Sequence, residues 1–387
     1  MKKVNKKNTV LVSSLLFCLQ ISLAQSIPFT SEQWVFKAQG QQVVDFQGQK
    51  SLRLQGGIAY LKDVMLQDGM IEFDVFVQDQ RSFFGAIFRI QDEKNYEEFY
   101  LRSHQSGKPD AMQYTPVYNG NSGWQLYHDQ GTPGSFDLND WKMTNVGGYN
   151  TPYVYSFGQW LHVKIVIAGT RAAVYFADNQ SPTLQITALK RGLQAGSIGI
   201  QAGAAPAHFA NFSYTKQHDI ELAMPTGITV PEEANRIRTW QVSDVFAEQT
   251  LENAVQLTPD FLKSRQWDEL SADRTGLANL SILRERSPEK NTVLAKFEIN
   301  STKPQIKKLE LGFSDRARVY CNGTILYSGN RNFQSQDYRY LGTIGYFDAV
   351  YLPLKKGKNE IIIAVSENFG GWGIQGKLEN LDAINVP

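Results

Sequence analysis

Residues 69–77 alternate strictly between apolar and polar side chains. The odd positions from 71 to 77 are all apolar, and Glu72 and Asp74 stand between them. A period of two is typical of a strand with one buried face. Other apolar-rich runs of strand length follow, separated by Gly, Asn, Asp and Pro, at residues 83–90, 96–102, 160–167, 172–176 and 197–201. No stretch of this half keeps a 3.6-residue period over three turns, so it predicts an antiparallel β-sandwich.

This pattern stops between residues 216 and 235. Pro225, Gly227 and Pro231 lie there in a polar stretch, as is typical of a linker. We therefore predict a first domain over residues 25–217, a linker over 218–235 and a second domain over 236–387.

The second half returns to strand patterning. Residues 293–300 alternate again, and Asn322-Gly323 supplies the two positive-φ positions of a type I′ hairpin turn. The continuous apolar run at residues 361–365 indicates a strand at the centre of a sheet. The predicted fold class is thus all-β, with two antiparallel jelly-roll sandwiches.

The first 24 residues predict a cleaved secretory signal peptide. Four lysines precede an apolar run at residues 10–23, and Ser22 and Ala24 provide the small residues that a signal peptidase reads. The alternative is a lipid anchor on Cys18, which the preceding Phe17 disfavours. We expect cleavage near Ala24 and a secreted or periplasmic location, with no later segment apolar enough to span a membrane.

Composition and charge narrow the possible partners. The chain has 31 Gly, 17 Tyr, 22 Phe and 7 Trp, a balance that favours strands and tight turns. Without the four leader lysines, 35 basic and 38 acidic residues remain, a net charge of −3. This balance argues against nucleic acid and anionic membranes as partners. Cys321 alone remains after cleavage, so no internal disulfide forms, and we expect it to be a buried apolar residue.

Framework segments in each half resemble known families. GMIEFDVF at 69–76 and WLHVKIVI at 160–167, with residues 172–176, 196–200 and 209–213, resemble the concanavalin A-like lectin/glucanase superfamily. Within it, laminin-G-like domains and the family named after 3-keto-disaccharide hydrolases are the most similar. In the second half, RVYCNG at 318–323, KGKNEIII at 356–363 and GGWG at 370–373 resemble the galactose-binding-like jelly roll of β-galactosidase-type enzymes. Both resemblances imply a carbohydrate-related protein.

The glucanase motif of the first family is incomplete. Glu72 and Asp74 match the first two carboxylates of Glu-x-Asp-x-x-Glu, but Val77 stands at the third position and Gln78 at the slot of a bulged variant. A glycosidase needs a second carboxylate across the cleft. We therefore interpret Glu72 and Asp74 as polar residues on the solvent face of the strand.

Residues 96–160 concentrate the side chains that bind sugars. Long loops there are rich in Tyr, Trp, Asn, Gln and Arg, and loops on a rigid sandwich commonly carry binding residues. The alternative is that these aromatics pack the loops down. The predicted ligand-binding residues are Arg89, Arg102, Gln113, Tyr118, Asn119 and Trp124 in the first domain, and Arg331, Arg339 and Tyr346 in the second. We expect Trp372, behind Gly370-Gly371, to be a core residue and the glycines to mark a close backbone approach or a bulge.

We expect no cofactor or metal. The five histidines lack metal-ligand spacing, and His162 has the alternation of a structural residue. Calcium is the one alternative, at Asp137, Asn139 and Asp140, although turns favour that composition too.

Three functions stay open. The first is an exported carbohydrate-binding protein. The second is a glycoside hydrolase or 3-keto-glycoside-processing enzyme, for which the sequence shows no assignable catalytic pair and offers Glu97, Glu98, Asp110, Asp129 and Asp137 as candidates. The third is an envelope protein-interaction module, because laminin-G-like domains also bind proteins.

Overall fold

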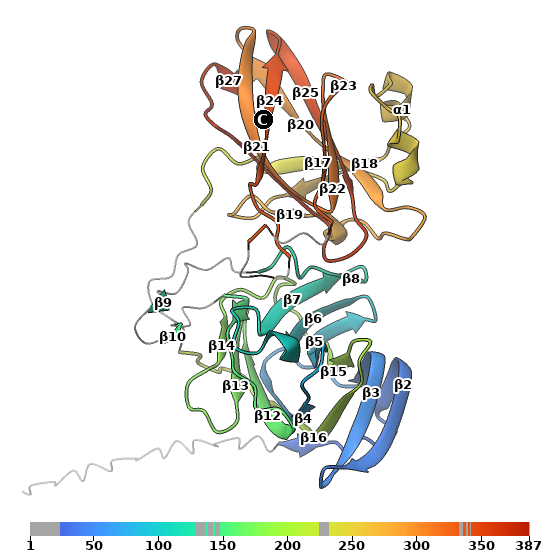
Figure 1. Ribbon diagram of the computed structural model, residues 1–387, viewed down its shortest axis with the longest axis vertical. Helices are drawn as coiled ribbons and strands as arrows, with labels where there is room; N and C mark the ends of the chain where they lie inside the picture. The colour runs from blue at the N-terminus through green and yellow to red at the C-terminus, as the bar shows by residue number, and fades with distance from the viewer. Residues whose placement is uncertain are drawn as a thin grey trace, which may run out of the picture.

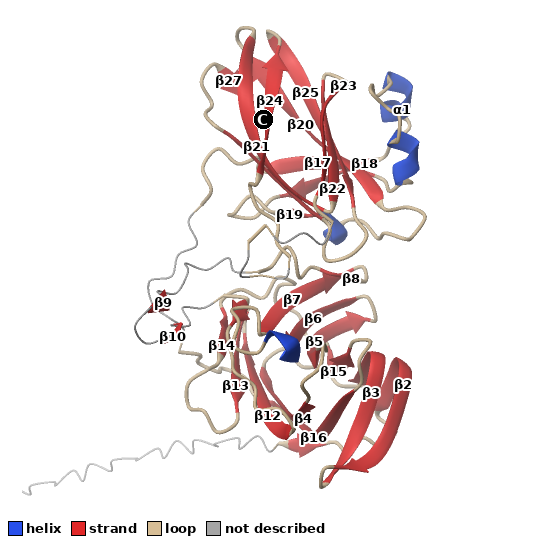
Figure 2. Ribbon diagram, in the orientation of Figure 1, coloured by secondary structure: helices blue, strands red, loops and turns tan. Residues whose placement is uncertain are grey.

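The computed structural model describes residues 24–128, 136–137, 142–143, 148–223, 232–332, 336–337, 340 and 342–386. Strands dominate and helices are short (Figure 2). The strands form two bodies, which we call the N-terminal unit (residues 24–223) and the C-terminal unit (residues 232–386) (Figure 1). Within these ranges no strand of one unit pairs with a strand of the other. The all-β prediction is confirmed, whereas the boundaries at residues 217 and 235 stay predictions.

The N-terminal unit is built on one curled antiparallel sheet. Its main path runs β11-β7-β6-β5-β15-β3-β16-β4-β12-β13-β14, and β1, β2 and β8 pair at its sides. Its strands are β1 Gln25–Ser26, β2 Trp34–Phe46, β3 Gln49–Leu61, β4 Gly69–Val77, β5 Phe84–Asp92, β6 Asn95–Leu101, β7 Met112–Tyr118, β8 Asn121–Ser122, β11 Asn150–Thr151, β12 Gln159–Ala168, β13 Arg171–Phe176, β14 Leu184–Ile186, β15 Ser197–Ala202 and β16 Ala207–Lys216. The short strands β9 Phe136–Asp137 and β10 Lys142–Met143 pair with each other, and the 3-10 helix η1 covers Ser103–Gln105.

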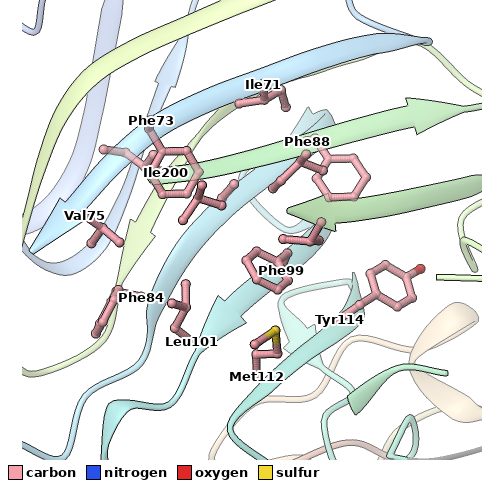
Figure 3. Packing of buried hydrophobic residues seen from close by; sticks show 14 of the residues in the cluster. Ile71, Phe73, Val75, Phe84, Phe88, Phe99, Leu101, Met112, Tyr114 and Ile200 are labelled. Carbon is pink, nitrogen blue, oxygen red and sulfur yellow. The ribbon is translucent and has the colours of Figure 1, made fainter. Parts of the chain in front are cut away.

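The sheet folds over through β3, which belongs to both layers. Leu52 to Leu54 pair with β16, and residues 57–60 pair with β15. The change of partner lies at Gly57, whose φ is +157°. A Cβ there would lie 2.1 Å from the carbonyl oxygen of Lys37, so the crossing requires glycine. The layers meet in one apolar core, where the Phe99 and Phe176 rings lie 6.3 Å apart (Figure 3 shows part of this core).

Strand β4 shows how alternation sets the two faces. Ile71, Phe73, Val75 and Val77 are all buried in the core, while Glu72 and Asp74 are half-buried on the other face. Figure 3 shows Phe73 and Val75 among the core residues. The predicted orientation of this strand is confirmed.

The C-terminal unit consists of two antiparallel sheets. The larger has the order β18-β17-β20-β25-β22-β23 with β27 beside β20, and the smaller has the order β19-β26-β21-β24. The strands are β17 Thr239–Ser243, β18 Trp267–Ser271, β19 Ala278–Asn279, β20 Thr292–Ser301, β21 Gln305–Ser314, β22 Arg316–Cys321, β23 Thr324–Asn330, β24 Asp348–Leu354, β25 Gly357–Ser366, β26 Gly373–Leu378 and β27 Ile384–Asn385. The helices are η2 Glu248–Leu251, α1 Pro259–Lys263 and η3 Leu280–Ile282. An apolar core with residues from both sheets lies between them.

Several local predictions hold in this unit. Asn322 and Gly323 have φ values of +51° and +83° and join β22 to β23. Strand β25 lies between β20 and β22, as its continuous apolar sequence predicted. Cys321 and Trp372 are buried in the core.

The two units are joined by apolar and polar contacts. Leu277 and Ile344 of the C-terminal unit belong to the core cluster of the N-terminal unit. Across the same junction the Asn119 side chain donates to the Ser281 carbonyl at 2.8 Å, and Lys190 pairs with Asp273 at 3.6 Å. The bodies also lie against each other next to β8 and β19 in Figure 1. The junction therefore fixes residues of one unit against the other.

No helix in the described ranges has the length and apolar character to cross a bilayer.

Candidate functional site

A cavity of about 680 Å³ lies at the junction of the two units. We call it the junction cavity. Its volume falls within the range of roughly 300–1,000 Å³ that is usual for small-molecule sites. The residues that line it are Arg81, Phe83, Glu98, Tyr100, Arg102, Gly120, Asn121, Ser122, Trp124, Gly203, Ala204, Arg286, Phe369 and Gly370. Both units contribute, so the cavity exists only where they meet.

Strand β6 supplies the polar wall through simple alternation. Phe99 and Leu101 point into the apolar core, and this turns Glu98 and Tyr100 to the opposite face, where they line the cavity. Arg102 follows directly after the strand and lines the cavity too. The alternation that directs Phe99 and Leu101 into the core therefore directs three polar side chains, Glu98, Tyr100 and Arg102, into the junction cavity.

Arg102 is the hub of a buried hydrogen-bond network. Its guanidinium pairs with Asp110 and donates to the Tyr100 hydroxyl at 2.8 Å and to Gln113 Oε1 at 2.7 Å. The Gln113 amide in turn donates to the Trp124 carbonyl at 2.8 Å. This chain of contacts connects the arginine to the backbone that carries the tryptophan.

The aromatic side chains of the cavity surround this arginine. The Arg102 guanidinium carbon lies 5.1 Å from the Tyr100 ring centre and 5.6 Å from the Trp124 ring centre. Trp124 lies 5.9 Å from Phe369 of the opposite unit. The Nε of Arg102 is buried and has no hydrogen-bond partner among the described residues.

Glu98 is a buried carboxyl in the same wall. Burial raises its pKa to about 7, against the opposing effects of the Ser122 hydroxyl, which donates to it at 3.2 Å, and of the charge of Arg102. Near neutral pH the side chain therefore exists in both protonation states and can donate or accept a hydrogen bond.

We expect Glu98→Gln to flatten the pH dependence of stability. The folded-state pKa of about 7 exceeds the ordinary value of 4.5, so the free energy of unfolding falls as pH rises from about 4.5 through 7. The variant lacks this loss, a difference on the order of 2–3 kcal/mol between pH 4 and pH 8. Urea unfolding at both pH values measures it, with exposed Glu32→Gln as the control. An unchanged difference in Glu98→Gln would contradict the burial argument.

Gln125 fixes the position of the loop at Phe369 and Gly370, which lines the cavity from the C-terminal unit. Its backbone N–H donates to the Gly370 carbonyl at 2.8 Å, its carbonyl accepts from the Ile344 N–H at 3.0 Å, and its Oε1 accepts from the Ser314 hydroxyl at 2.6 Å. A Cβ on Gly370 would lie 2.6 Å from Gln125 Cδ, and the φ of Gly370 is +116°. The predicted close backbone approach at Gly370-Gly371 is thus observed, and it brings Phe369 to the cavity.

The structure brings two of the predicted ligand-binding residues, Arg102 and Trp124, into the junction cavity. Gln113 stands behind them, fully buried. Tyr118 and Asn119 do not line the cavity. The Tyr118 hydroxyl instead donates to the Lys190 carbonyl at 2.6 Å, and the Asn119 side chain donates to the Ser281 carbonyl.

Arg89 lies elsewhere and performs a structural task. Its guanidinium is fully buried and donates to the carbonyl oxygens of Gln67, Gly169 and Gly192. Three backbone segments are thereby held together around one side chain. The sequence did not predict that Arg89 is buried. Its φ of +50° lies at an irregularity in β5, and side-chain alternation does not predict which way a residue points at such an irregularity.

Two of the residues predicted in the second domain, Arg331 and Tyr346, do not line the cavity. Arg331 pairs with Asp348 at 2.8 Å, and the Tyr346 hydroxyl donates to the Thr275 carbonyl at 2.9 Å. Arg339 lies outside the described residues. These three positions stay predictions without a common site.

Most of the aromatic-rich stretch packs the N-terminal unit. Four of its tyrosines, Tyr114, Tyr127, Tyr149 and Tyr155, are buried in the core. The loop-packing alternative therefore explains them, whereas Tyr100 and Trp124 face the cavity.

The candidate carboxylates separate into different roles. Glu97 is buried and accepts from the Tyr114 hydroxyl at 2.6 Å, and Asp110 is committed to Arg102. Asp129 and the side chain of Asp137 lie outside the described residues, as do Asn139 and Asp140 of the calcium alternative. Within the part of the chain that is described, no group of three metal-ligating side chains could hold an ion.

Glu72 and Asp74 form a separate polar cluster with His162. Asp74 lies 2.7 Å and Glu72 3.4 Å from the imidazole nitrogens. Hydrogen bonds to these carboxylates raise the pKa of His162 to about 9, so the ring is charged at neutral pH. Val77 is buried in the core, and the third carboxylate of the glucanase motif is thus absent from this strand.

Among the lining side chains that sequence reasoning missed are Arg81, Phe83, Arg286 and Phe369. They come from loops on both sides of the linker, and no local pattern connects them. The one sequence feature that pointed to any of them was the glycine pair after Phe369, because it indicated a loop that approaches another backbone closely.

No protein-family model matches the sequence, and no match was found among curated proteins. Solved structures share a limited likeness. Carbohydrate-binding module CBM66 from Bacillus subtilis is 16% identical with a TM-score of 0.32, over 48% of this chain and 96% of that one. A mutant of the GH43 protein BlXynB from Bacillus licheniformis is 12% identical with a TM-score of 0.32, over 48% of this chain and 37% of that one. The xylan β-1,4-xylosidase from Bacillus halodurans is 12% identical with a TM-score of 0.32, over 49% of this chain and 38% of that one. At such scores the superfamily resemblances stay predictions.

Proposed function

We propose that this chain is an exported carbohydrate-binding protein whose ligand occupies the junction cavity. The observation that carries the proposal is the combination of aromatic surfaces and polar groups in one space of about 680 Å³. Export rests on the predicted signal peptide, residues 1–24.

The aromatic groups suit the apolar faces of a sugar ring. Trp124 and Phe369 approach each other from opposite units, and Phe83 and Tyr100 lie 6.2 Å apart in the same lining. Phe369 is 53% exposed, so part of its ring is open to a ligand. Large flat side chains give contact area at a small cost in conformational entropy.

The polar groups suit sugar hydroxyls. Arg102, Asn121 and Ser122 line the cavity as polar residues, and the Glu98 carboxyl changes between donor and acceptor near neutral pH. Fixed polar groups within a mostly apolar wall are what gives a small-molecule site its orientation and specificity.

Binding is favoured over hydrolysis by the number of carboxyls. Hydrolysis of a glycoside by the usual route uses two, one on each side of the scissile bond. Among the described residues that line the junction cavity, Glu98 is the only acidic one. Among the described residues, the enzyme alternative therefore has one carboxyl in this space where the usual route needs two.

Calorimetric titration of the mature chain with a panel of neutral and acidic oligosaccharides tests the proposal. We expect saturable binding of at least one member, and release of no reducing sugar during prolonged incubation. Absence of binding across the panel would overturn the carbohydrate proposal. Release of reducing sugar that Glu98→Gln abolishes would instead establish the enzyme alternative.

A further inference from the structure

The junction cavity carries more basic than acidic side chains. Arg81, Arg102 and Arg286 line it, against Glu98 as the only described acidic residue. The charge of Arg102 is already balanced by Asp110, since both side chains are 2% exposed and form an ion pair. The excess positive charge therefore comes from Arg81 and Arg286.

These two arginines have free hydrogen-bonding capacity. Over the described ranges neither forms an ion pair or a side-chain hydrogen bond, and both line the cavity. Arg81 is exposed and Arg286 is half-buried. A planar guanidinium offers paired N–H groups that match the two oxygens of a carboxylate or a sulfate.

The two buried carboxyls near Arg286, those of Asp315 and Glu367, do not use its hydrogen-bond donors. Asp315 and Glu367 both feel the charge of Arg286, but Asp315 Oδ2 accepts from the backbone N–H groups of Asn368 at 2.8 Å and Phe369 at 3.3 Å. Burial raises the pKa of Glu367 well above its ordinary value, and its two oxygens accept from the Gly371 N–H at 3.3 Å and the Ser314 hydroxyl at 3.2 Å. Neither of these two described carboxyls forms an ion pair with Arg286.

The half-buried imidazole of His104 lies near the same positive charges. Burial lowers its pKa, and the charges of Arg102, Arg81 and Lys108 lower it further. The charges of Arg81 and Arg286 in the lining favour an anionic ligand over a neutral one.

We propose that the saccharide bound in the junction cavity is acidic, with a carboxylate or sulfate group held by Arg81 and Arg286. The inference rests on the proposed carbohydrate-binding function and names its ligand class. Arg81 lies in the loop between β4 and β5, and Arg286 lies between η3 and β20 of the other unit. An anionic group that contacts both would bridge the two units, with the sugar ring against Trp124 and Phe369.

Titration calorimetry with three matched ligands tests this: an oligogalacturonate, its methyl ester, and a sulfated neutral oligosaccharide of the same length. We expect an acidic ligand to bind at least about 10-fold more tightly than the ester at low salt, with an advantage that shrinks as salt is raised. Arg81→Gln and Arg286→Gln should each weaken acidic binding about 10-fold and weaken binding of the ester much less. Arg171→Gln, an exposed arginine at the start of β13, is the matched control.

The outcomes separate the two proposals. Equal affinity for the acid and the ester, unaltered in both arginine variants, would overturn the acidic-ligand inference and leave carbohydrate binding intact. Binding of no ligand in this set or in the wider panel would overturn the proposed function as well. Preference for the carboxylate or the sulfate decides which anionic group the arginines hold.

Discussion

Replacing Trp124 with alanine is expected to weaken saccharide binding by about 30-fold or more. Central aromatic residues of a binding site contribute on the order of 2 kcal/mol or more when truncated to alanine. Trp124 is 9% exposed, contacts Phe369 across the junction and lies over the Arg102 guanidinium. Its loss removes a stacking surface and opens the wall between the two units.

Two further variants separate ligand contact from damage to the fold. Trp160→Ala removes a half-buried tryptophan of β12 that does not line the cavity, and its affinity should equal that of the wild type. Trp124→Phe keeps a smaller ring and should recover part of the binding. Isothermal calorimetry measures all three, and urea unfolding checks that they are folded. Wild-type affinity in a folded Trp124→Ala variant would exclude the junction cavity as the site.

Replacing Asp110 with asparagine is expected to destabilise the N-terminal unit by about 3–5 kcal/mol. The change leaves the Arg102 guanidinium buried without its counter-charge, and removal of one partner of a buried ion pair costs about this much. Asp110 also accepts from the Asn150 side chain, so the loop that begins at β11 loses an anchor as well. The same variant should bind saccharide more weakly, because Arg102 helps to position Trp124 through Gln113.

Urea unfolding with a matched pair of variants measures this effect. Glu93→Gln breaks the exposed ion pair with Lys37 and should change stability little. The double replacement Arg102→Met and Asp110→Leu removes both charges and should recover much of the lost stability. Stability of Asp110→Asn equal to that of the wild type would show that the buried pair contributes nothing to the fold.

The junction cavity also explains why only part of the site could be predicted. Arg102 and Trp124 belong to a stretch of unusual aromatic and polar content, and that content was visible along the chain. Arg286 and Phe369 lie more than a hundred residues further on, in loops with no sugar-binding signature. Gln113 has the residue type of a ligand contact but serves as a buried support, because its amide connects Arg102 to the Trp124 backbone.

The sequence by itself determined the local structure: which face of β4 is buried and where the Asn322-Gly323 hairpin turns. Each of these depends on residues close together in the chain, through side-chain alternation or positive φ. Only the tertiary structure decided that Arg89 holds three carbonyls and that Trp124 meets Phe369 in a cavity. Those contacts join segments distant in sequence, and their geometry depends on how the curled sheet closes and how Gln125 packs against Gly370 of the other unit.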